Sequence, residues 1–436
     1  MKKKKVIIMG AGGKDFHVFN TAFKNRGEYE VMAFTAASQV PGIAGRTYPA
    51  RLAGNMYPDG IPIEPEEDLV GLIRSHRIDE VVMCYSDVSY EHVLECEQMC
   101  QEAGAEFKLS PDEQVMIPST KHVVAITGVR TGSGVSAMAR KIVEMLRSKG
   151  RRVAIVHHPM PYGDIQRQEF QRFESLEDLD RHECTIEERE EYEQHIEKGT
   201  LVFSGVDYCR ILLEAEMEAD VLVWDGGNND IPFYRPDIYI CMADPLRAGA
   251  ERDYYPGKIN FSNAGVIVIN KADSARAEQI DEVKASAKEL NPNARVVVTR
   301  MPYTVDKPEL IQGKRVLVVE DGPTLTHGNM RFGAGMLAAR KFGAASIVNP
   351  RPHAVGSIAE MLDAWEIDSL LPATGYNAAQ IADLAKTIAA VPCDAIVVGT
   401  PINLGAVFPI AKPVARVSYD IEEVDAGSLR KMLQDF

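Results

Sequence analysis

A glycine-rich run between an apolar segment and a helix-compatible segment is the strongest chemical signal in the sequence. The run covers residues 128–136, follows the apolar residues 123–127 and precedes residues 137–149, which fit a helix. In such loops, backbone N–H groups and the N-terminus of the following helix point at phosphate oxygens, and glycine lets the backbone approach closely. We therefore predict a nucleotide-binding P-loop formed by Thr131, Gly132, Ser133, Gly134, Val135 and Ser136.

One position in this loop departs from the usual pattern. Val135 stands where P-loops carry the lysine that contacts the β- and γ-phosphates. A hydrogen bond to a charged group contributes about 1.5–3 kcal/mol, so the missing cation predicts triphosphate binding that is weaker by roughly tenfold to a hundredfold. Slow hydrolysis, or binding without turnover, is the expected consequence.

Arg130 is a candidate for the missing cation. It occupies the place of the signature lysine in the deviant P-loops of dimeric ATPases, and the loop resembles those of the septum-site and nitrogenase iron-protein class. In that class the residue reaches the nucleotide of the partner subunit. The resemblance therefore implies a catalytic role for Arg130 and a homodimer or higher homo-oligomer, and a surface ion pair is the alternative.

A second apolar segment ends in a carboxylate. Residues 221–224 are apolar and are followed directly by Asp225. A strand-terminal aspartate downstream of a P-loop can hold Mg²⁺ together with the Ser or Thr hydroxyl of the loop. We therefore predict that Ser136 and Asp225 bind Mg²⁺, and that Asn229 and Asp230, just past this strand, act near the γ-phosphate.

The motif Asn270-Lys271-Ala272-Asp273 follows a third apolar segment, residues 264–269. It matches the Asn-Lys-x-Asp pattern of G proteins, in which the aspartate can accept two hydrogen bonds from guanine. Asn270, Lys271 and Asp273 are therefore predicted to bind the nucleotide base, and a turn at a strand end is the alternative. ATP and GTP both stay candidates for the nucleotide.

Further polar residues stand in the loops that follow predicted strands. In a doubly wound domain these loops lie at the carboxyl edge of the sheet, where ligands bind. His158 can act as acid, base or phosphate ligand and Asp164 can orient a nucleophile, so both are candidate catalytic residues. The predicted contacts of a small anionic, phosphorylated substrate are Arg247, His327, Arg331 and Arg351. Caps, turns and surface ion pairs are the alternatives.

Positioning these residues requires parallel sheets. At the start of the chain, apolar residues 5–9 lead into Gly10-Ala11-Gly12-Gly13-Lys14-Asp15, and further strands are predicted at 30–35 and 80–85. The glycines form a partial dinucleotide fingerprint, but Asp15 stands where the third glycine belongs. A Rossmann-like scaffold or a site for another anion is expected here, with a dinucleotide site as the alternative. The turn-rich residues 41–65 predict an irregular loop.

A further α/β unit is predicted after residue 313, with strands at 314–320, 345–348 and 395–398 and helices at 335–341 and 383–390. We therefore predict an α/β protein in which a P-loop NTPase domain is flanked by an N-terminal Rossmann-like α/β domain and a C-terminal α/β substrate domain. The expected boundaries are 1–118, 119–312 and 313–436.

Composition limits the classes of partner. The formal net charge of -15 disfavours nucleic acid, because binding to nucleic acid depends on Lys and Arg at phosphates. No apolar run approaches the length of a membrane span, so we expect a cytoplasmic protein with no membrane partner. The seven cysteines are scattered, which predicts reduced, buried thiols rather than a metal site. The strongly charged residues 174–197 predict a solvated helix.

With these motifs in place, the whole chain resembles the cyclic 2,3-diphosphoglycerate synthetase family and related predicted GTPases. The strings that carry the likeness lie at residues 10–17, 41–46, 158–164, 224–230 and 320–328. The resemblance implies ATP-dependent closure of a phosphoanhydride in an oligomer, although Val135 departs from the lysine expected in this family. A nucleotide-gated switch or metallochaperone-like GTPase, and a P-loop that binds nucleotide without turnover, are the alternatives.

Overall fold

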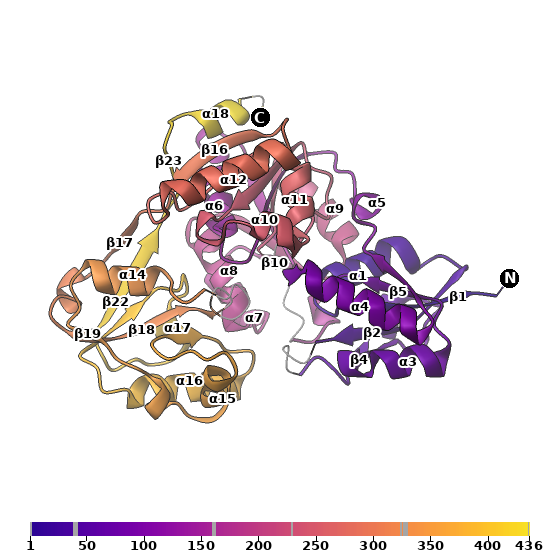
Figure 1. Cartoon of the computed structure of the whole chain (residues 1–436), viewed down its shortest axis with the longest axis horizontal. Coiled ribbons are helices and arrows are strands. Elements are labelled where there is room, and N and C mark those ends of the chain that lie inside the picture. The colour runs from indigo at the N-terminus through magenta and orange to yellow at the C-terminus, as the bar shows by residue number, and fades with distance from the viewer. Residues whose placement is uncertain are drawn as a thin grey trace.

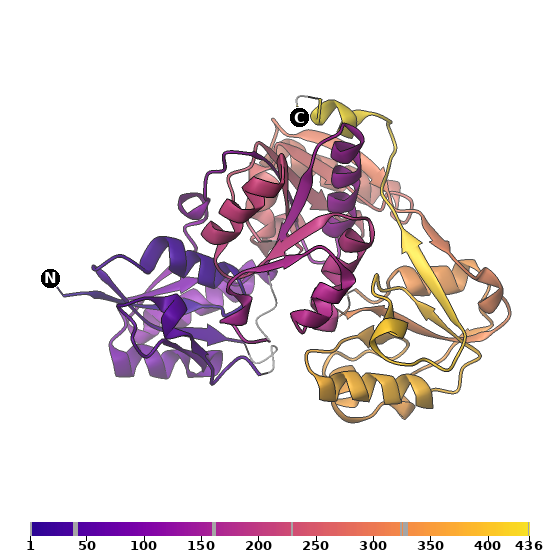
Figure 2. The ribbon, with the colours of Figure 1, turned by 180° about the vertical axis from the view of Figure 1, so that it is seen from behind.

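Three β-sheets, each flanked by helices, follow one another along the chain (Figures 1 and 2). The computed structural model describes residues 2–37, 42–158, 163–227, 230–322, 325, 330–434 and 436. The central unit lies at the apex, and the third and first units lie below it, to its left and right, in Figure 1. The α/β fold with a central P-loop unit and two flanking α/β units is confirmed.

The first sheet has the order β3-β4-β2-β1-β5-β7, and all of its pairs are parallel except β3 with β4. Counted along the chain, its parallel strands run 3-2-1-4-5, the order of a Rossmann-like half-sheet. The strands are β1 (Lys4–Met9), β2 (Tyr29–Ala36), β3 (Thr47–Tyr48), β4 (Ile61–Pro65), β5 (Glu80–Met83) and β7 (Glu106–Leu109). The helices are α1 (Lys14–Val18), η1 (Phe19–Phe23), α2 (Ala50–Ala53), η2 (Glu66–Asp68), α3 (Leu69–His76), α4 (Tyr90–Ala103) and α5 (Asp112–Val115).

The central sheet has nine strands in the order β10-β11-β9-β12-β8-β13-β15-β16-β23. Its inner strands β9, β12, β8, β13 and β15 are largely apolar runs buried on both faces, as expected for a parallel sheet covered by helices. The strands of the whole sheet are β8 (His122–Gly128), β9 (Val153–His157), β10 (Gln171–Phe173), β11 (Leu201–Ser204), β12 (Val221–Asp225), β13 (Ile238–Ala243), β15 (Val266–Ile269), β16 (Arg295–Arg300) and β23 (Glu422–Glu423).

The helices of the central unit include α6, which directly follows the P-loop, and α8, which faces the third unit. They are α6 (Val135–Ser148), η3 (Arg167–Glu169), α7 (Leu176–Arg181), α8 (Ile186–Glu197), α9 (Tyr208–Glu218), η4 (Pro245–Arg247), α10 (Ala250–Asp253), α11 (Gly257–Asn263), α12 (Ala277–Leu290) and α18 (Ser428–Met432). In the described part of the chain, no helix is long and apolar enough to cross a membrane.

The third sheet has the order β17-β22-β21-β18-β19, with β20 also paired to β18. Its strands are β17 (Tyr303–Val305), β18 (Arg315–Asp321), β19 (Ser346–Ile347), β20 (Leu371–Ala373), β21 (Ala395–Val398) and β22 (Val414–Tyr419). Its helices are η5 (Pro308–Leu310), α14 (Ala334–Lys341), η6 (Arg351–His353), α15 (Gly356–Ala364), α16 (Ala378–Ala390) and α17 (Leu404–Val407).

Several segments connect the units. β6 (Val88–Ser89), from the first unit, pairs with β14 (Tyr254–Tyr255), from the central unit. The chain also returns to the central sheet at its C-terminal end, where β23 pairs with β16 and α18 covers the same unit (Figure 1). Strand β17 lies before the predicted boundary at 312/313 but belongs to the third sheet, and β23 lies after it but belongs to the central sheet.

Two sequence expectations about local structure are wrong. Residues 61–65, within the predicted irregular loop, form strand β4 of the first sheet, paired with both β2 and β3. The charged stretch predicted to be a solvated helix contains α8, in which eight residues are buried, among them Glu187, Glu188, Glu190 and Glu193. This helix is buried between the central and third units because its carboxylates find hydrogen-bond donors on both.

Candidate nucleotide-binding site

The P-loop lies between the end of β8 and the start of α6, as the sequence predicts. Gly132 and Gly134 have φ angles of 78° and 107°, a left-handed conformation that glycine adopts without strain. A side chain at Gly134 would also collide with the Asn270 amide. The loop therefore needs glycine at position 134 for two independent reasons.

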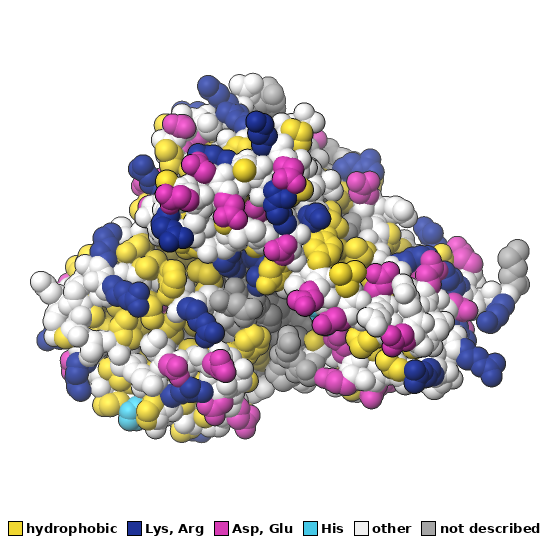
Figure 3. Space-filling model, in the orientation of Figure 1, with side chains coloured by type: hydrophobic (Ala, Val, Ile, Leu, Met, Phe, Trp, Pro, Cys, Tyr) yellow, Lys and Arg dark blue, Asp and Glu magenta, His cyan; other side chains and the backbone are white. Residues whose placement is uncertain are grey.

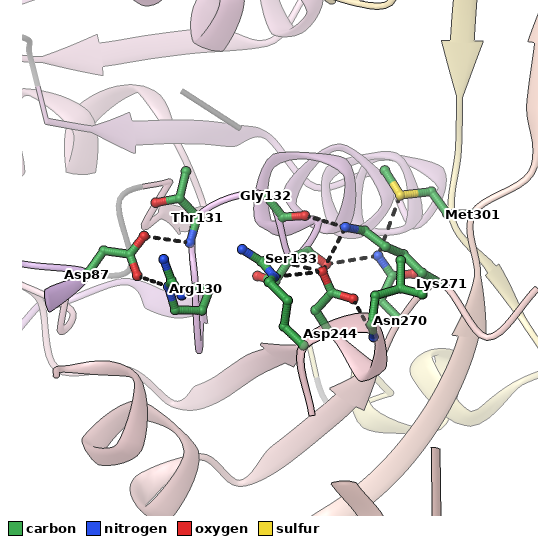
Figure 4. Close-up of polar contacts among 11 residues, drawn as sticks. Asp87, Arg130, Thr131, Gly132, Ser133, Asp244, Asn270, Lys271 and Met301 are labelled. Carbon is green, nitrogen blue, oxygen red and sulfur yellow. Dashed lines mark hydrogen bonds and ion pairs between the residues drawn. The ribbon is translucent and has the colours of Figure 1, made fainter. Parts of the chain in front are cut away.

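The predicted base-binding loop is tied directly to the P-loop (Figure 4). Asn270 Nδ2 donates a hydrogen bond to the Ser133 carbonyl oxygen at 3.0 Å, and Lys271 Nζ donates to the Gly132 carbonyl oxygen at 2.7 Å. Lys271 also pairs with Asp244 at 2.9 Å. Asn270 and Lys271 therefore fix the backbone of the phosphate loop.

Asp273 lies at the exposed end of the same motif. Its Oδ1 accepts a hydrogen bond from the Met301 backbone N–H at 3.0 Å. Base binding by Asp273 stays a prediction, since the observed contact is one that a structural turn would also make.

Ser136 and Asp225 lie together at the edge of the central sheet, where the predicted metal site requires them. Ser136 Oγ donates to Glu191 Oε2 at 2.8 Å and lies 3.5 Å from Asp225 Oδ1. Potential ligand atoms of His157, Glu191 and Asp225 lie within 4.8 Å of one another. The buried Nδ1 of His157 has no hydrogen-bond partner among the described residues. The hydroxyl and carboxylate oxygens are the ligand type that Mg²⁺ prefers, so these side chains fit a divalent cation.

The pKa values of the two acidic side chains of this cluster shift in opposite directions. Burial and the nearby charge of Asp225 raise the pKa of Glu191 above its ordinary value. Burial acts on Asp225 in the same direction, but the bond from His195 and the neighbouring His157 hold the pKa of Asp225 below its ordinary value. A divalent cation between the carboxylates would favour the ionised form of both, as a bound cation does elsewhere.

Arg130 faces the first unit rather than the cleft. Its Nε lies 2.5 Å from Asp87 Oδ1, and its guanidinium stacks 3.6 Å from the ring centroid of Tyr254. The second oxygen of Asp87 accepts a hydrogen bond from the Thr131 N–H at 3.1 Å (Figure 4). Arg130 is thus part of a buried ion pair that connects the P-loop to the first unit, and its contact with a nucleotide stays a prediction.

The other candidate catalytic residues divide into two places. His158 Nε2 lies 3.1 Å from Asp230 Oδ2, both side chains are buried, and Ser86 Oγ donates to Asp230 Oδ1. Asp164 is exposed and accepts a hydrogen bond from the Gln166 N–H at 2.9 Å, a local turn contact. Asn229 lies outside the described residues.

A cleft opens between the P-loop and the third unit. Figure 3 shows hydrophobic side chains gathered on the third unit where it faces the central unit. The charged residues that line the cleft are Arg140, Glu190, Glu191, Lys271, Glu320 and Asp321. Among the described residues that line it, carboxylates therefore outnumber cations.

The predicted substrate-binding arginines are not among the described residues that line this cleft. Arg247 pairs with Asp244 at 3.0 Å, and Arg351 bridges Asp363 and Asp368 on the outside of the third unit. Arg331 lies in a separate pocket, where it contacts the Glu366 carbonyl oxygen at 3.4 Å. His327 lies outside the described residues, and the substrate role of all four stays a prediction.

The site also contains residues that sequence reasoning missed. Arg140, on α6, is 6% exposed and lines the cleft beside the P-loop. Glu190 and Glu191, on α8, contact Thr400 of the third unit and Ser136 of the P-loop, respectively. The sequence did contain a signal for Glu190 and Glu191, namely the charged residues along the whole of 186–197. A helix that is polar on all sides can bridge two units instead of covering a core.

The N-terminal glycine loop is occupied by its own chain. The Asp15 carboxylate accepts hydrogen bonds from the N–H groups of Gly12 at 2.8 Å, Gly13 at 3.2 Å and Phe16 at 2.7 Å. Burial raises the pKa of Asp15 to about 6. The N–H groups that would bind a phosphate in this loop therefore bind the Asp15 carboxylate instead. This arrangement agrees with the expectation of a Rossmann-like scaffold.

Comparison with known proteins identifies the family. The chain is 52% identical over 436 residues to arginine synthetase ArcE of Thermococcus kodakarensis, an alignment that covers all of this chain and 97% of the relative. The chain belongs to the family of this synthetase. Synthetases couple bond formation to cleavage of a nucleoside triphosphate, so this membership makes the chain a nucleotide-dependent ligase. No family model matches the chain.

The cyclic 2,3-diphosphoglycerate synthetases are more distant relatives. The one from Thermococcus sibiricus is 23% identical over 283 residues, which is 58% of this chain and 62% of the relative. The resemblance found in the sequence is therefore correct for the wider family, but the specific reaction it implied is not supported by the more similar relative.

Solved structures are similar only in outline. LpxK of Aquifex aeolicus, in complex with ATP, aligns with a TM-score of 0.46 and 11% identity over 79% of this chain and 95% of that chain. The hydrogenase maturation factor HypB of Archaeoglobus fulgidus aligns with a TM-score of 0.23 and 17% identity over 40% of this chain and 79% of that chain. The P-loop assignment therefore rests on the strand order and loop geometry above.

Proposed function

We propose that the chain is a nucleotide-dependent synthetase that forms arginine. The observation that carries this proposal is the 52% identity to an arginine synthetase over all of this chain and 97% of the relative. The P-loop, the Ser136–Asp225 pair and the cleft supply the parts that such an enzyme needs.

The product and the P-loop together restrict the chemistry. A guanidino group can be built from a ureido group if its carbonyl oxygen is converted to a leaving group. Transfer of the γ-phosphoryl group to that oxygen does this, and attack by ammonia on the ureido carbon then releases inorganic phosphate. The balanced reaction takes citrulline, ammonia and a nucleoside triphosphate to arginine, a nucleoside diphosphate and phosphate.

The charges in the cleft support this substrate class. Glu190, Glu320 and Asp321 line the cleft, and Glu191 lies beside the P-loop, where its Oε2 accepts a hydrogen bond from Ser136 Oγ. Burial raises the pKa values of Glu190, Glu191 and Glu320 above their ordinary values. These side chains can accept hydrogen bonds from a guanidinium group, and in their ionised form they repel a diphosphoglycerate, which carries several negative charges. The walls therefore favour a substrate that becomes cationic over the anionic one expected from the sequence.

The chain's own groups would position the nucleotide. The N–H groups of the P-loop and the start of α6 would bind the phosphates, and Arg140 would supply a cation in place of the lysine missing at Val135. Ser136 and Asp225 would hold Mg²⁺, which neutralises phosphate charge when bound. Glu191 and His195 orient these two ligands through their hydrogen bonds.

The test is an assay of arginine formation. The protein would be incubated with Mg²⁺, citrulline and ammonium, with ATP and GTP compared side by side, and arginine and phosphate would be quantified. We expect both products in equal amounts, and only when all substrates are present. Asp225→Asn should abolish turnover, whereas Asp220→Asn, a change near the opposite end of the same strand, should retain it. Phosphate release that depends on 2,3-diphosphoglycerate instead would overturn the proposal.

A further inference from the structure

Three side chains of metal-binding type meet in the first unit, away from the nucleotide site. They are Glu66, in η2 just after β4, and His92 and Cys96, on α4. One potential ligand atom from each lies within 4.8 Å of the other two. The cluster lies near the carboxyl edge of the first parallel sheet, where open α/β sheets place their ligands.

The separations match the edges of a tetrahedral metal site. His92 Nε2 lies 3.6 Å from Cys96 Sγ and 3.8 Å from Glu66 Oε1. With metal–ligand bonds of about 2.0–2.3 Å, the edges of a tetrahedron with S, N and O ligands are about 3.3–3.6 Å long. The two separations from His92 are thus within a few tenths of an ångström of a tetrahedral edge, and the third, between Glu66 and Cys96, lies within 4.8 Å.

The local structure holds these side chains in place. His92 and Cys96 are four residues apart on one helix, so both point to the same side of α4. Ser89 caps this helix by accepting a hydrogen bond from the His92 N–H at 3.1 Å. The other ring nitrogen of His92 lies 3.6 Å from Glu95 Oε2, an arrangement that in metal sites orients the histidine.

Access from solvent is also present. The Cys96 side chain is fully buried, whereas the side chains of Glu66 and His92 are 18% and 39% exposed. An ion can therefore approach from the side of His92 and reach a thiol that the protein otherwise protects.

We propose that Glu66, His92 and Cys96 bind a divalent transition-metal ion of the zinc class. A thiolate, an imidazole and a carboxylate suit Zn²⁺ and Co²⁺ better than Mg²⁺, and three protein ligands leave a fourth position for water. The site is independent of the proposed arginine synthesis, and it differs from the expectation that the cysteines serve only as buried thiols.

The test uses Co²⁺ as a probe on the full-length protein after removal of metals with a chelator. A thiolate bound to Co²⁺ gives a charge-transfer absorption that oxygen and nitrogen ligands do not, so the Ser136–Asp225 site does not interfere. We expect this absorption to saturate at one Co²⁺ per chain and to disappear when Zn²⁺ is added. Cys96→Ser should abolish it, and Cys100→Ser, which removes a buried thiol one turn further along α4, should preserve it.

His92→Gln serves as a second variant, since its half-exposed side chain can change without disturbing the core. It should weaken Co²⁺ binding by about tenfold or more. Absence of the charge-transfer absorption in the wild-type protein, or its persistence in Cys96→Ser, would overturn the proposal.

Discussion

Glu320 is a buried carboxylate at the end of β18 that stabilises the start of α14. Its Oε1 accepts a hydrogen bond from the Met336 N–H at 2.7 Å, and its Oε2 accepts one from the Gly335 N–H at 3.1 Å. The residue is 1% exposed. Burial raises its pKa from 4.5 to about 7, although the backbone hydrogen bonds oppose this shift.

This pKa makes the stability of the protein depend on pH. Because the native chain binds a proton at Glu320 more tightly than the unfolded chain, the contribution of Glu320 is most favourable below about pH 4.5. It is lost as the pH rises from about 4.5 to about 7. At about 1.4 kcal/mol per pKa unit, the loss is on the order of 3 kcal/mol.

The substitution Glu320→Gln should remove this dependence, because glutamine stays neutral. Glutamine offers only one acceptor oxygen, so it forfeits one N–H bond at a cost of about 1 kcal/mol. The variant should therefore be about as stable as the wild type near pH 5 and about 2 kcal/mol more stable near pH 8.

Urea unfolding between about pH 5 and pH 8, followed by circular dichroism and tryptophan fluorescence, measures this difference. Glu360→Gln, an exposed glutamate on α15 of the same unit, is the matched control and should leave the pH profile unchanged. Parallel profiles for Glu320→Gln and the wild type would refute the reasoning, because they would show that Glu320 ionises normally in the folded protein.

Three further predictions concern the nucleotide site. Arg140→Met removes a charged hydrogen-bond donor, so it should weaken nucleotide binding, measured by calorimetry, by about tenfold to a hundredfold. Equal affinities for this variant and the control Lys141→Met would contradict a contact between Arg140 and the nucleotide. Ser136→Ala should weaken binding in the presence of Mg²⁺ but not in its absence; a loss that is the same with and without Mg²⁺ would exclude a metal role for the hydroxyl. Asp87→Asn should lower the free energy of unfolding by about 3–5 kcal/mol, because it removes the carboxylate that pairs with the buried Arg130 guanidinium. An unchanged urea midpoint would show that the Asp87–Arg130 pair does not stabilise the contact between the first and central units.

The elements of the central sheet were predictable because local pattern and tertiary environment agree. Residues 123–126 and 221–224 are apolar, and the sheet buries both faces of them in β8 and β12. Gly132, Gly134 and Ser136 follow directly, so their positions at the sheet edge depend only on the strand that precedes them. Ser136 and Asp225 could be paired from sequence for this reason.

The remainder of the site depends on contacts between distant segments. Glu191 is brought to Ser136 by the packing of α8 against the P-loop, and nothing local distinguishes it from a solvated glutamate. Strand β4 contains Pro62 and Pro65, which read as turn residues, yet it pairs on both sides because other residues supply the hydrogen bonds. Arg130 was assigned by loop position, whereas Asp87 of another unit determines where its side chain points.

The most direct test of arginine synthesis follows the ureido oxygen. Citrulline labelled in its ureido group with heavy oxygen would be supplied with ammonium, Mg²⁺ and the preferred nucleotide, and the released phosphate would be analysed by mass spectrometry. Transfer of the phosphoryl group to the ureido oxygen predicts that each phosphate carries one labelled oxygen and that arginine appears in equal amount. Unlabelled phosphate, or phosphate released without arginine, would contradict the proposed function.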